Sequence, residues 1–395
     1  MNRSRILISG AGIAGLTLAY WLNRYGFQVT VVEQAQALRA GGQAVDLKGP
    51  VQMSILRKMG IFSAVRDADV RDADVAIVNA SGRRVGRIPG ALGAGDVNIP
   101  RGDLVAILYE RTKRDCEYLF DDSIATLAEM PHGVDVTFRA GEPRTFDLVV
   151  GADGMHSTVR RLVFGPERDY VSHLGAYYVL ADLDVGPEIV SYSQPGLMVT
   201  LGATKAPAFL AFASPVLPSA RGDVDLQKRQ TATALRNGRW RIPELVAQLP
   251  GATGFFMDSV SRAVVGNWSH GRIVLVGDSA WGNTLGGYGT GLALVGAYVL
   301  AGELAQAGGD HAVAFAAYQE NCRDHVRVSQ KVNAARLLVP RTWSGIYARN
   351  LLFTVLGLAE PLLKLLDRPA SGITLENYDP WAKPTDPQGD DPCPA

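Results

Sequence analysis

A glycine pattern near the start of the chain, GAGIAG at residues 10–15, constrains the fold more than any other feature. It follows an apolar run at residues 5–9, which predicts a buried strand, and it opens a helical pattern at residues 13–25. In a G-x-G-x-x-G turn the glycines permit a tight bend, let a pyrophosphate approach the backbone, and let helix and strand pack closely. The helix start adds free N–H groups for the phosphates. The candidate cofactor contacts are Gly10, Gly12, Ala14 and Gly15.

A second strand strengthens this prediction. Residues 27–33 are rich in valine and close with Glu33, whose carboxylate can accept hydrogen bonds from an adenosine ribose. Strand, turn, helix, strand and terminal acid together predict a dinucleotide-binding βαβ unit, against the alternative of a glycine-rich turn without a ligand. This unit alone does not separate FAD from NAD.

Composition limits the class of protein. The 395 residues carry 39 Lys and Arg and 39 Asp and Glu, and this zero net charge argues against a nucleic-acid partner. Three scattered cysteines are too few for a disulfide framework or a thiolate metal site, so we expect a cytoplasmic protein without a metal. We expect no signal peptide and no transmembrane segment, because the apolar stretch at residues 350–359 is about half of the ~20 residues that a span needs.

A second motif lies at residues 147–161, DLVVGADGMHSTVRR. It predicts a buried strand, an Asp-Gly turn and a helix. Gly154 after Asp153 lets the backbone reverse near a ligand, and Arg160 is a candidate anchor for a phosphate or a carboxylate. Asp153 as a simple helix cap and His156 as a helix-start residue, with no role in catalysis, are the alternatives.

A third motif, IVLVGDSA at residues 273–280, precedes the glycine-rich segment LGGYGTG and a helix over residues 289–306. A carboxylate after a strand can bind the hydroxyls of a ribityl chain, and glycines let bare N–H groups approach a flat isoalloxazine ring. The helix start would stabilise negative charge on a reduced flavin. The candidate cofactor contacts here are Gly277, Asp278, Gly286, Gly287, Gly289 and Thr290.

With these three motifs in order, the sequence resembles the single-component FAD-dependent monooxygenases of the aromatic-hydroxylase type, the group of para-hydroxybenzoate hydroxylase and the tetracycline-inactivating monooxygenases. The resemblance spans about residues 5–303. It implies that Asp153 and Gly154 serve both FAD and the nicotinamide cofactor, and that Asp278 contacts the ribityl chain. It also implies an FAD contact from Arg101, in an R-x-x-L pattern, and from Arg39.

The sequence departs from the family in the third motif. The family usually has G-D-A-A-H-x-x-x-P, whereas this chain has Trp281 in place of the histidine and no proline beside the flavin. We expect Trp281 either to pack on the flavin or substrate, or to take part in ordinary interface packing. We expect FAD binding to survive, because Asp278 and the glycines remain.

The motifs predict an α/β fold: a discontinuous Rossmann-like FAD-binding domain with an inserted, mostly β substrate domain and C-terminal helices. The FAD-binding domain is expected at residues 1–169 and 266–310, with some substrate-domain strands near residues 74–100. The substrate domain is expected at residues 170–265, closing helices at 311–368 and a frayed tail at 369–395. One helix is expected over residues 312–338.

The resemblance implies that FAD is bound non-covalently and is reduced by NADPH or NADH. O2 then adds to the reduced flavin and gives a flavin hydroperoxide, which oxygenates an aromatic or polyketide-like small molecule. Other interpretations are a flavin reductase, dehydrogenase or halogenase of the same fold, or a non-catalytic FAD- or metabolite-binding protein. No catalytic residue is named and the oligomeric state stays open. The residues considered as a base or hydrogen-bond donor, each more simply structural, are His173, Tyr177, Tyr178 and Tyr192.

Overall fold

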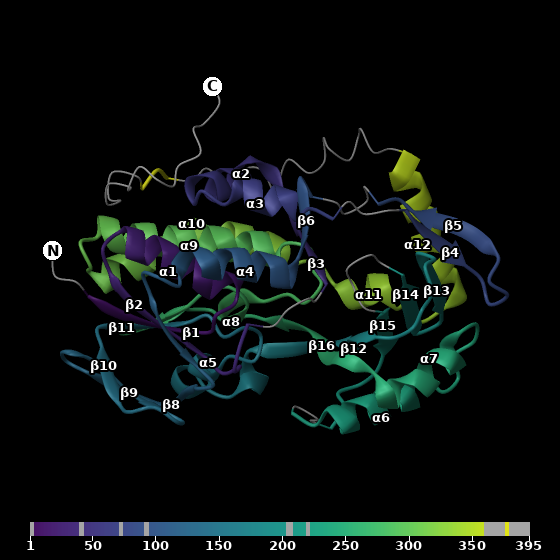
Figure 1. The fold of residues 1–395 in the computed structure, drawn as a ribbon, viewed down its shortest axis with the longest axis horizontal. Coiled ribbons are helices and arrows are strands. Elements are labelled where there is room, and N and C mark those ends of the chain that lie inside the picture. The colour runs from purple at the N-terminus through teal and green to yellow at the C-terminus, as the bar shows by residue number, and fades with distance from the viewer. Residues whose placement is uncertain are drawn as a thin grey trace.

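The computed structural model describes residues 4–38, 43–70, 74–90, 95–202, 208–218, 222–358 and 376–378. Two large sheets lie end to end, with a layer of helices covering one face of the first sheet (Figure 1). Arg39 and most of the predicted tail lie outside the described residues. Within them, no helix is long and apolar enough to cross a membrane.

The first sheet has six strands in the order β17-β18-β11-β1-β2-β7. All neighbouring pairs are parallel except β17 with β18. Strands from both halves of the chain therefore form one sheet, since β18 joins β11 directly. Its strands are β1 (Arg5–Ser9), β2 (Gln28–Glu33), β7 (Glu117–Phe120), β11 (Leu148–Gly151), β17 (Ser269–His270) and β18 (Ile273–Leu275).

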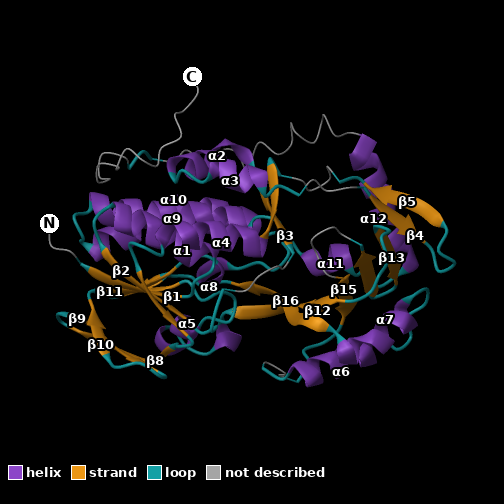
Figure 2. Cartoon of the chain, in the orientation of Figure 1, coloured by secondary structure: helices purple, strands orange, loops and turns teal. Residues whose placement is uncertain are grey.

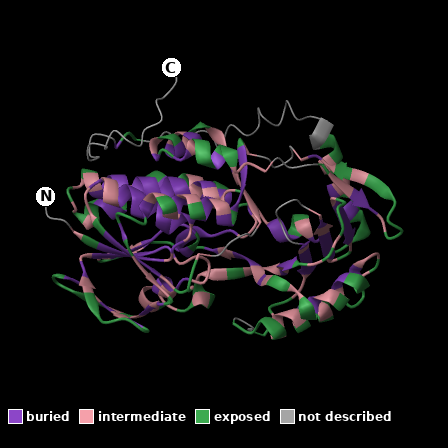
Figure 3. Cartoon of the chain, in the orientation of Figure 1, coloured by how far each residue is buried: buried purple, intermediate pink, exposed green. Residues whose placement is uncertain are grey.

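The core of this unit explains the apolar runs in the sequence. Strands β1, β11 and β18 are buried almost throughout, as expected for parallel strands covered on both faces (Figure 3). Helix α1 (Ile13–Arg24) packs against α4 (Arg101–Thr112) and α9 (Gly289–Gln306). The ring of Trp21 meets that of Tyr298 edge to face at 4.8 Å. Residues far apart in the sequence thus form one core.

The second sheet has seven strands in the order β16-β12-β15-β14-β13-β4-β5. Helices α6 (Val224–Leu235) and α7 (Ile242–Gln248) pack against one face, and α11 (Ala334–Leu338) packs against the other (Figure 2). Two early strands complete this sheet at one edge, because β4 pairs with β13. Its strands are β4 (Val75–Val78), β5 (Arg84–Ile88), β12 (Val171–Asp182), β13 (Val190–Gln194), β14 (Leu197–Leu201), β15 (Ala208–Ala213) and β16 (Thr253–Ala263).

Smaller elements complete the fold. Two minor sheets pair β3 (Ala44–Leu47) with β6 (Val97–Pro100), and β8 (Ile124–Met130) with β9 (Gly133–Phe138) and β10 (Arg144–Phe146). The other helices are α2 (Gly49–Lys58), α3 (Phe62–Asp67), α5 (Thr158–Val163), η1 (Glu167–Asp169), α6 (Val224–Leu235), α7 (Ile242–Gln248), η2 (Leu249–Gly251), α8 (Asp278–Trp281), α10 (His311–Ser329), α11 (Ala334–Leu338) and α12 (Trp343–Leu358).

The prediction of a single helix over residues 312–338 is wrong, because the helix is interrupted between α10 and α11. The Asn283 amide donates to the carbonyl oxygens of Ser329 at 2.8 Å and Val332 at 3.0 Å, and Asn333 caps the new helix by accepting from the Arg336 N–H. Long-range hydrogen bonds from Asn283, which precedes the glycine-rich segment, therefore end the helix.

Part of the tail that we expected to be frayed is packed. Tyr378 is 1% exposed, and its hydroxyl donates to the Glu303 carboxylate on α9 at 2.6 Å. Its ring lies edge to face with that of Tyr298, at 5.3 Å between centroids.

Candidate active site

The three motifs meet at the carboxyl ends of the first sheet. The φ of Gly10 is +105°, and a β-carbon there would lie 2.7 Å from the Ala152 carbonyl oxygen in the second motif. A β-carbon on Gly277 would lie 2.9 Å from that of Ala14. Glycine at both positions therefore lets the first motif pack against the other two.

Glu33 holds the glycine turn in place. Its carboxylate accepts hydrogen bonds from the Ala11 N–H at 2.8 Å and the Ala35 N–H at 2.9 Å. The acid predicted at the end of β2 therefore lies beside the turn, where the sequence places a ribose.

Asp153 caps helix α5. Its carboxylate accepts from the N–H groups of Thr158 at 2.8 Å and Val159 at 3.1 Å, and from the hydroxyls of Ser157 and Ser9. Burial raises the pKa of Asp153, and these hydrogen bonds offset part of that rise. Its carboxylate is thus occupied within the protein, as the helix-cap interpretation expects. Gly154, with φ of +79°, has open space on its β-carbon side.

Arg160 lies inside the protein. It is 0% exposed, and its guanidinium donates to the carbonyl oxygens of Ser279 at 2.8 Å and Met155 at 2.6 Å. Its donors are therefore directed at protein carbonyl oxygens. It joins the second motif to the third.

Asp278 and Arg101 face one another across the glycine turn. Burial raises the pKa of Asp278 while the charge of Arg101 lowers it, and yet both residues are exposed to solvent. A β-carbon on Gly12 would lie 3.8 Å from Nη2 of Arg101. The Asp278 carboxylate makes no hydrogen bond to any described residue. A carboxylate that is surrounded by protein, accessible and without a partner suits a ligand rich in hydroxyls.

The glycine-rich segment borders this carboxylate. A β-carbon on Gly289 would lie 3.6 Å from Oδ1 of Asp278, and Thr290 follows in the first turn of α9. Gly287 is exposed, with φ of +82° and open space around its β-carbon position. Gly286 is buried instead, where a β-carbon would lie 2.7 Å from the Asn283 amide nitrogen. Gly289 thus presents bare backbone beside Asp278, and Gly287 presents bare, exposed backbone two residues earlier.

Sequence reasoning missed two residues in this region. Leu285 has φ of +58°, a strained conformation for a leucine, and it packs against the same buried cluster of the second sheet as Tyr178. Gln52 on α2 lies against Gly291 at the start of α9 and accepts from the Lys48 N–H at 2.8 Å. Neither residue belongs to a motif, so only the tertiary structure reveals them.

Trp281 packs inside the protein. It is 2% exposed, and its ring lies 4.5 Å from that of Trp268 and 6.0 Å from that of Tyr318. A β-carbon on Gly296 would lie 3.0 Å from Cζ2 of Trp281. Of the two interpretations of this substitution, the structure agrees with interior packing.

His156 connects the two large sheets. Its Nδ1 lies 3.0 Å from the Glu167 carboxylate, and its Nε2 lies 3.0 Å from Oδ1 of Asp258 on β16. Since an ionised carboxylate only accepts hydrogen bonds, this arrangement favours the doubly protonated imidazolium. His156 is therefore a bridge to the second sheet, more than a helix-start residue.

The four residues considered as a catalytic base or hydrogen-bond donor differ in their contacts. The Tyr177 hydroxyl accepts from the Leu217 N–H, the Tyr192 hydroxyl donates to Gln194, and a His173 nitrogen lies 2.9 Å from the Ser214 carbonyl oxygen. These three are held by the protein. The fourth, Tyr178, lies between the rings of Phe209 and Phe256 on the face toward the first sheet.

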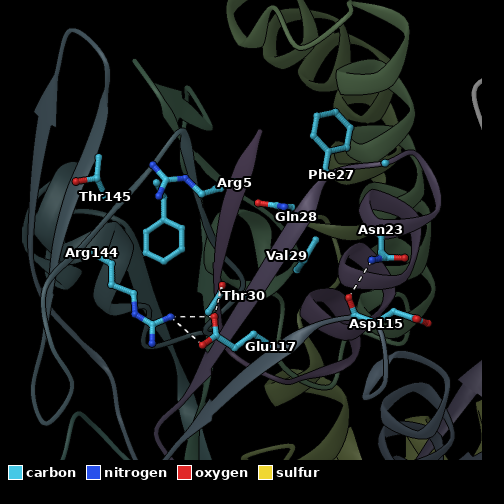
Figure 4. A pocket seen from close by; sticks show the side chains of 12 residues that line it. Arg5, Asn23, Phe27, Gln28, Val29, Thr30, Asp115, Glu117, Arg144 and Thr145 are labelled. Carbon is cyan, nitrogen blue, oxygen red and sulfur yellow. Dashed lines mark hydrogen bonds and ion pairs between the residues drawn. The ribbon is translucent and has the colours of Figure 1, made fainter. Parts of the chain in front are cut away.

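A groove of about 620 Å³ lies at the opposite ends of the strands (Figure 4). It is bordered by Arg5 and Gln28, where β1 and β2 begin, and by the Glu117–Arg144 ion pair of 2.8 Å. Ligands of open parallel sheets bind outside the carboxyl ends. This groove is therefore separate from the candidate site.

Comparison with known proteins agrees with this geometry. Residues 3–331 match the family described as "FAD binding domain". The chain belongs to this FAD-binding family. A relative from Legionella longbeachae serogroup 1 (strain NSW150), named flavin-dependent monooxygenase, is 34% identical over 394 residues, covering 95% of this chain and 98% of the relative. This member of the FAD-binding family is thus an FAD-dependent oxidoreductase of the monooxygenase type.

Solved structures of the FAD-binding family share the fold. The crystal structure of tetracycline destructase Tet(55) is 32% identical, with a TM-score of 0.79, covering 95% of this chain and 99% of that one. That of tetracycline destructase Tet(51) is 29% identical, with a TM-score of 0.82, covering 95% of this chain and all of the other. The expected α/β fold of the aromatic-hydroxylase type is confirmed.

The residues of this chain fit FAD. The cofactor needs bare backbone for its pyrophosphate and polar groups for its ribityl chain. A β-carbon on Gly12 would meet only the Arg101 guanidinium, at 3.8 Å, and Asp278 is an accessible carboxylate with no hydrogen-bond partner among the described residues. The start of α9 adds free N–H groups beside that carboxylate.

Proposed function

We propose that this monooxygenase uses NADPH or NADH and O2 to place one oxygen atom on an aromatic or polyketide-like small molecule. The observation that carries the proposal is the accessible group formed by Gly12, Arg101 and Asp278 where the three motifs meet. The relatives named flavin-dependent monooxygenase and the tetracycline destructases support the reaction class.

We assign direct FAD contacts by motif. The pyrophosphate would lie on the glycine turn beside Arg101, the ribose beside Glu33, and the ribityl chain beside Asp278. The remaining proposed contacts are Gly10, Ala14, Gly15, Arg39, Gly154, Gly277, Gly286, Gly287, Gly289 and Thr290. Asp153 and Arg160 act as positioning residues, because their polar atoms bond to the protein.

When bound, FAD would accept hydride from the nicotinamide and activate O2. The chain's part is placement and charge. The first turn of α9 holds Gly289 and Thr290 next to Asp278, so its N–H groups would stabilise negative charge on the ring. Leu285 and the aromatic residues of the second sheet would exclude water from the reacting groups.

We assign FAD binding and substrate binding to different sheets. We propose that residues 1–169 and 266–310 hold FAD, that residues 170–265 with the strands near 74–100 hold the substrate, and that residues 311–368 support both. A cytoplasmic location fits Cys116 and Cys322, which are buried free thiols.

The test is coupled turnover. FAD-loaded protein is supplied with NADPH or NADH in air, with and without a panel of phenols and polycyclic aromatic compounds. We expect an aromatic compound to accelerate nicotinamide oxidation and to gain one oxygen atom. Reduction of a compound without oxygen gain would instead indicate a reductase, and no nicotinamide oxidation with any compound would indicate a binding protein.

A further inference from the structure

We propose that Asp258 and Tyr178 form an acceptor–donor pair that selects substrates carrying a hydroxyl group next to a carbonyl group. This inference rests on the proposed function, because it places the substrate between the second sheet and the flavin. Asp258 would accept the hydrogen bond of the substrate hydroxyl. Tyr178 would donate one to the neighbouring carbonyl oxygen.

The two residues are direct neighbours across the strands. Tyr178 on β12 pairs with Asp258 on β16 in an antiparallel register. Directly opposed residues point to the same face of a sheet, with β-carbons about 5 Å apart. Two neighbouring polar groups of one ligand can therefore reach the two residues. A hydroxyl would reach Asp258, and a carbonyl on the same ring system would reach Tyr178.

Tyr178 lies on the side of the sheet that faces the FAD site. It packs in one cluster with Leu285 of the glycine-rich segment, and the charges of Arg101 and Asp278 act on its hydroxyl. Burial raises the pKa of Tyr178, the charge of Asp258 raises it further, and the opposing charge of Arg101 offsets only part of this rise, so the hydroxyl stays protonated. It makes no hydrogen bond to any described residue. A neutral phenol without a partner is a donor available to a ligand.

Asp258 offers the complementary acceptor. Its Oδ1 accepts a 2.7 Å hydrogen bond from the backbone N–H of Ser259 and lies 3.0 Å from Nε2 of His156. Its Oδ2 makes only a 3.3 Å contact with the same nitrogen among the described residues. The side chain is 23% exposed. One oxygen is thus fixed by the protein while the other keeps capacity for a ligand.

His156 is a positioning residue in this arrangement. Glu167 holds Nδ1 of the ring at 3.0 Å, which turns Nε2 toward Asp258. These two contacts of His156 fix the Asp258 carboxylate relative to the FAD-binding motif that contains His156. The substrate hydroxyl would therefore be held at a defined position relative to the flavin.

The surroundings suit a flat ring system. The Tyr178 ring lies 6.3 Å from that of Phe209, at 24° between planes, and 5.8 Å from that of Phe256. Met198 and Ala211 continue this face next to Tyr178. An apolar, aromatic surface with one donor and one acceptor matches an aromatic hydroxy-carbonyl compound better than a charged or sugar-like one.

Two flavones test the pair. 3-Hydroxyflavone carries a hydroxyl next to its carbonyl, and flavone has the carbonyl alone. Each is titrated into oxidised, FAD-loaded enzyme without NAD(P)H, and binding is followed by the change in flavin absorbance. The variants are Asp258→Asn, Tyr178→Phe and, as the matched control on the opposite face of the sheet, Tyr177→Phe. The Asp258→Asn change keeps a side-chain carbonyl oxygen for His156 and Ser259 and replaces the free oxygen by a donor.

We expect the wild-type enzyme to bind 3-hydroxyflavone about tenfold or more tightly than flavone, since a hydrogen bond to a charged group is lost with flavone. Asp258→Asn removes this preference, Tyr178→Phe weakens both ligands several-fold, and Tyr177→Phe changes neither. Equal binding of the two flavones, binding of neither, or a preference that survives Asp258→Asn would overturn the inference. Because no turnover is measured, such a result leaves the proposed oxygenation to be judged by its own assay.

Discussion

Nη1 of Arg160 donates a 2.8 Å hydrogen bond to the carbonyl oxygen of Ser279, the residue after Asp278. The two residues are 119 positions apart and belong to different motifs. Nη2 of the same guanidinium holds the Met155 carbonyl oxygen at 2.6 Å, beside the Asp153 turn. One fully buried side chain thus sets the position of Asp278 relative to the second motif.

Arg160→Met should destabilise the protein by about 3 kcal/mol, because one buried and one partly buried carbonyl oxygen lose a charged donor. The expected result is a lower Tm of the FAD-free protein in a thermal melt. Arg161→Met is the matched control, since Arg161 is exposed on the same helix, and it should melt like wild type. A wild-type Tm for Arg160→Met combined with lost FAD binding would mean that Arg160 contacts the cofactor directly.

Asp278→Asn should weaken FAD binding about tenfold or more, because the amide replaces a charged acceptor for the ribityl hydroxyls. The same change should leave the Tm of the FAD-free protein close to that of the wild type, because the Asp278 side chain is exposed and makes no hydrogen bond to a described residue. Flavin fluorescence and thermal melts measure the two effects, with exposed Asp324→Asn on α10 as the control. Unchanged FAD affinity would contradict the role given to Asp278.

The charge of Arg101 lowers the pKa of Asp278. FAD affinity that needs the ionised carboxylate is present above this pKa and is lost as pH falls through it. Arg101→Gln removes the lowering charge, so the loss should begin at a higher pH than in the wild type. Titrating FAD between about pH 5 and about pH 8 tests this shift. Two parallel affinity curves would show that Arg101 does not act on Asp278.

Trp281→Ala should cost about 3–5 kcal/mol of stability, because it opens a cavity beside Trp268 and Tyr318. Trp281→Phe should cost far less and keep FAD affinity. Chemical denaturation measures both. If Trp281→Ala keeps its stability but loses substrate binding, the ring contacts the ligand and the packing interpretation fails.

The motifs were predictable from sequence because each combines a local conformation with a residue type. Glycine at residue 10 and glycine at residue 277 both adopt positive φ values, and the strands before them are uninterrupted apolar runs. The meeting of these motifs follows from the parallel order of β1, β11 and β18. Local signals therefore suffice for the fold of the FAD-binding part.

The roles of individual polar residues were harder to predict, since they depend on partners far away in the sequence. The sequence around Arg160 predicts a phosphate anchor, whereas the Ser279 carbonyl oxygen accepts its hydrogen bond. The pairing of Tyr178 with Asp258 depends on an irregular register between β12 and β16, which no sequence pattern marks. Roles that are set by tertiary contacts therefore cannot be predicted from periodicity.

The most direct test of the central claim follows the oxygen atom itself. FAD-loaded enzyme turns over an accepted aromatic substrate with NADPH under O2 labelled with ¹⁸O, and the product is analysed by mass spectrometry. We expect one labelled oxygen atom in each product molecule, and none when the label is in water instead. A product without the label, or one labelled only from water, would contradict the assignment of the chain as a monooxygenase.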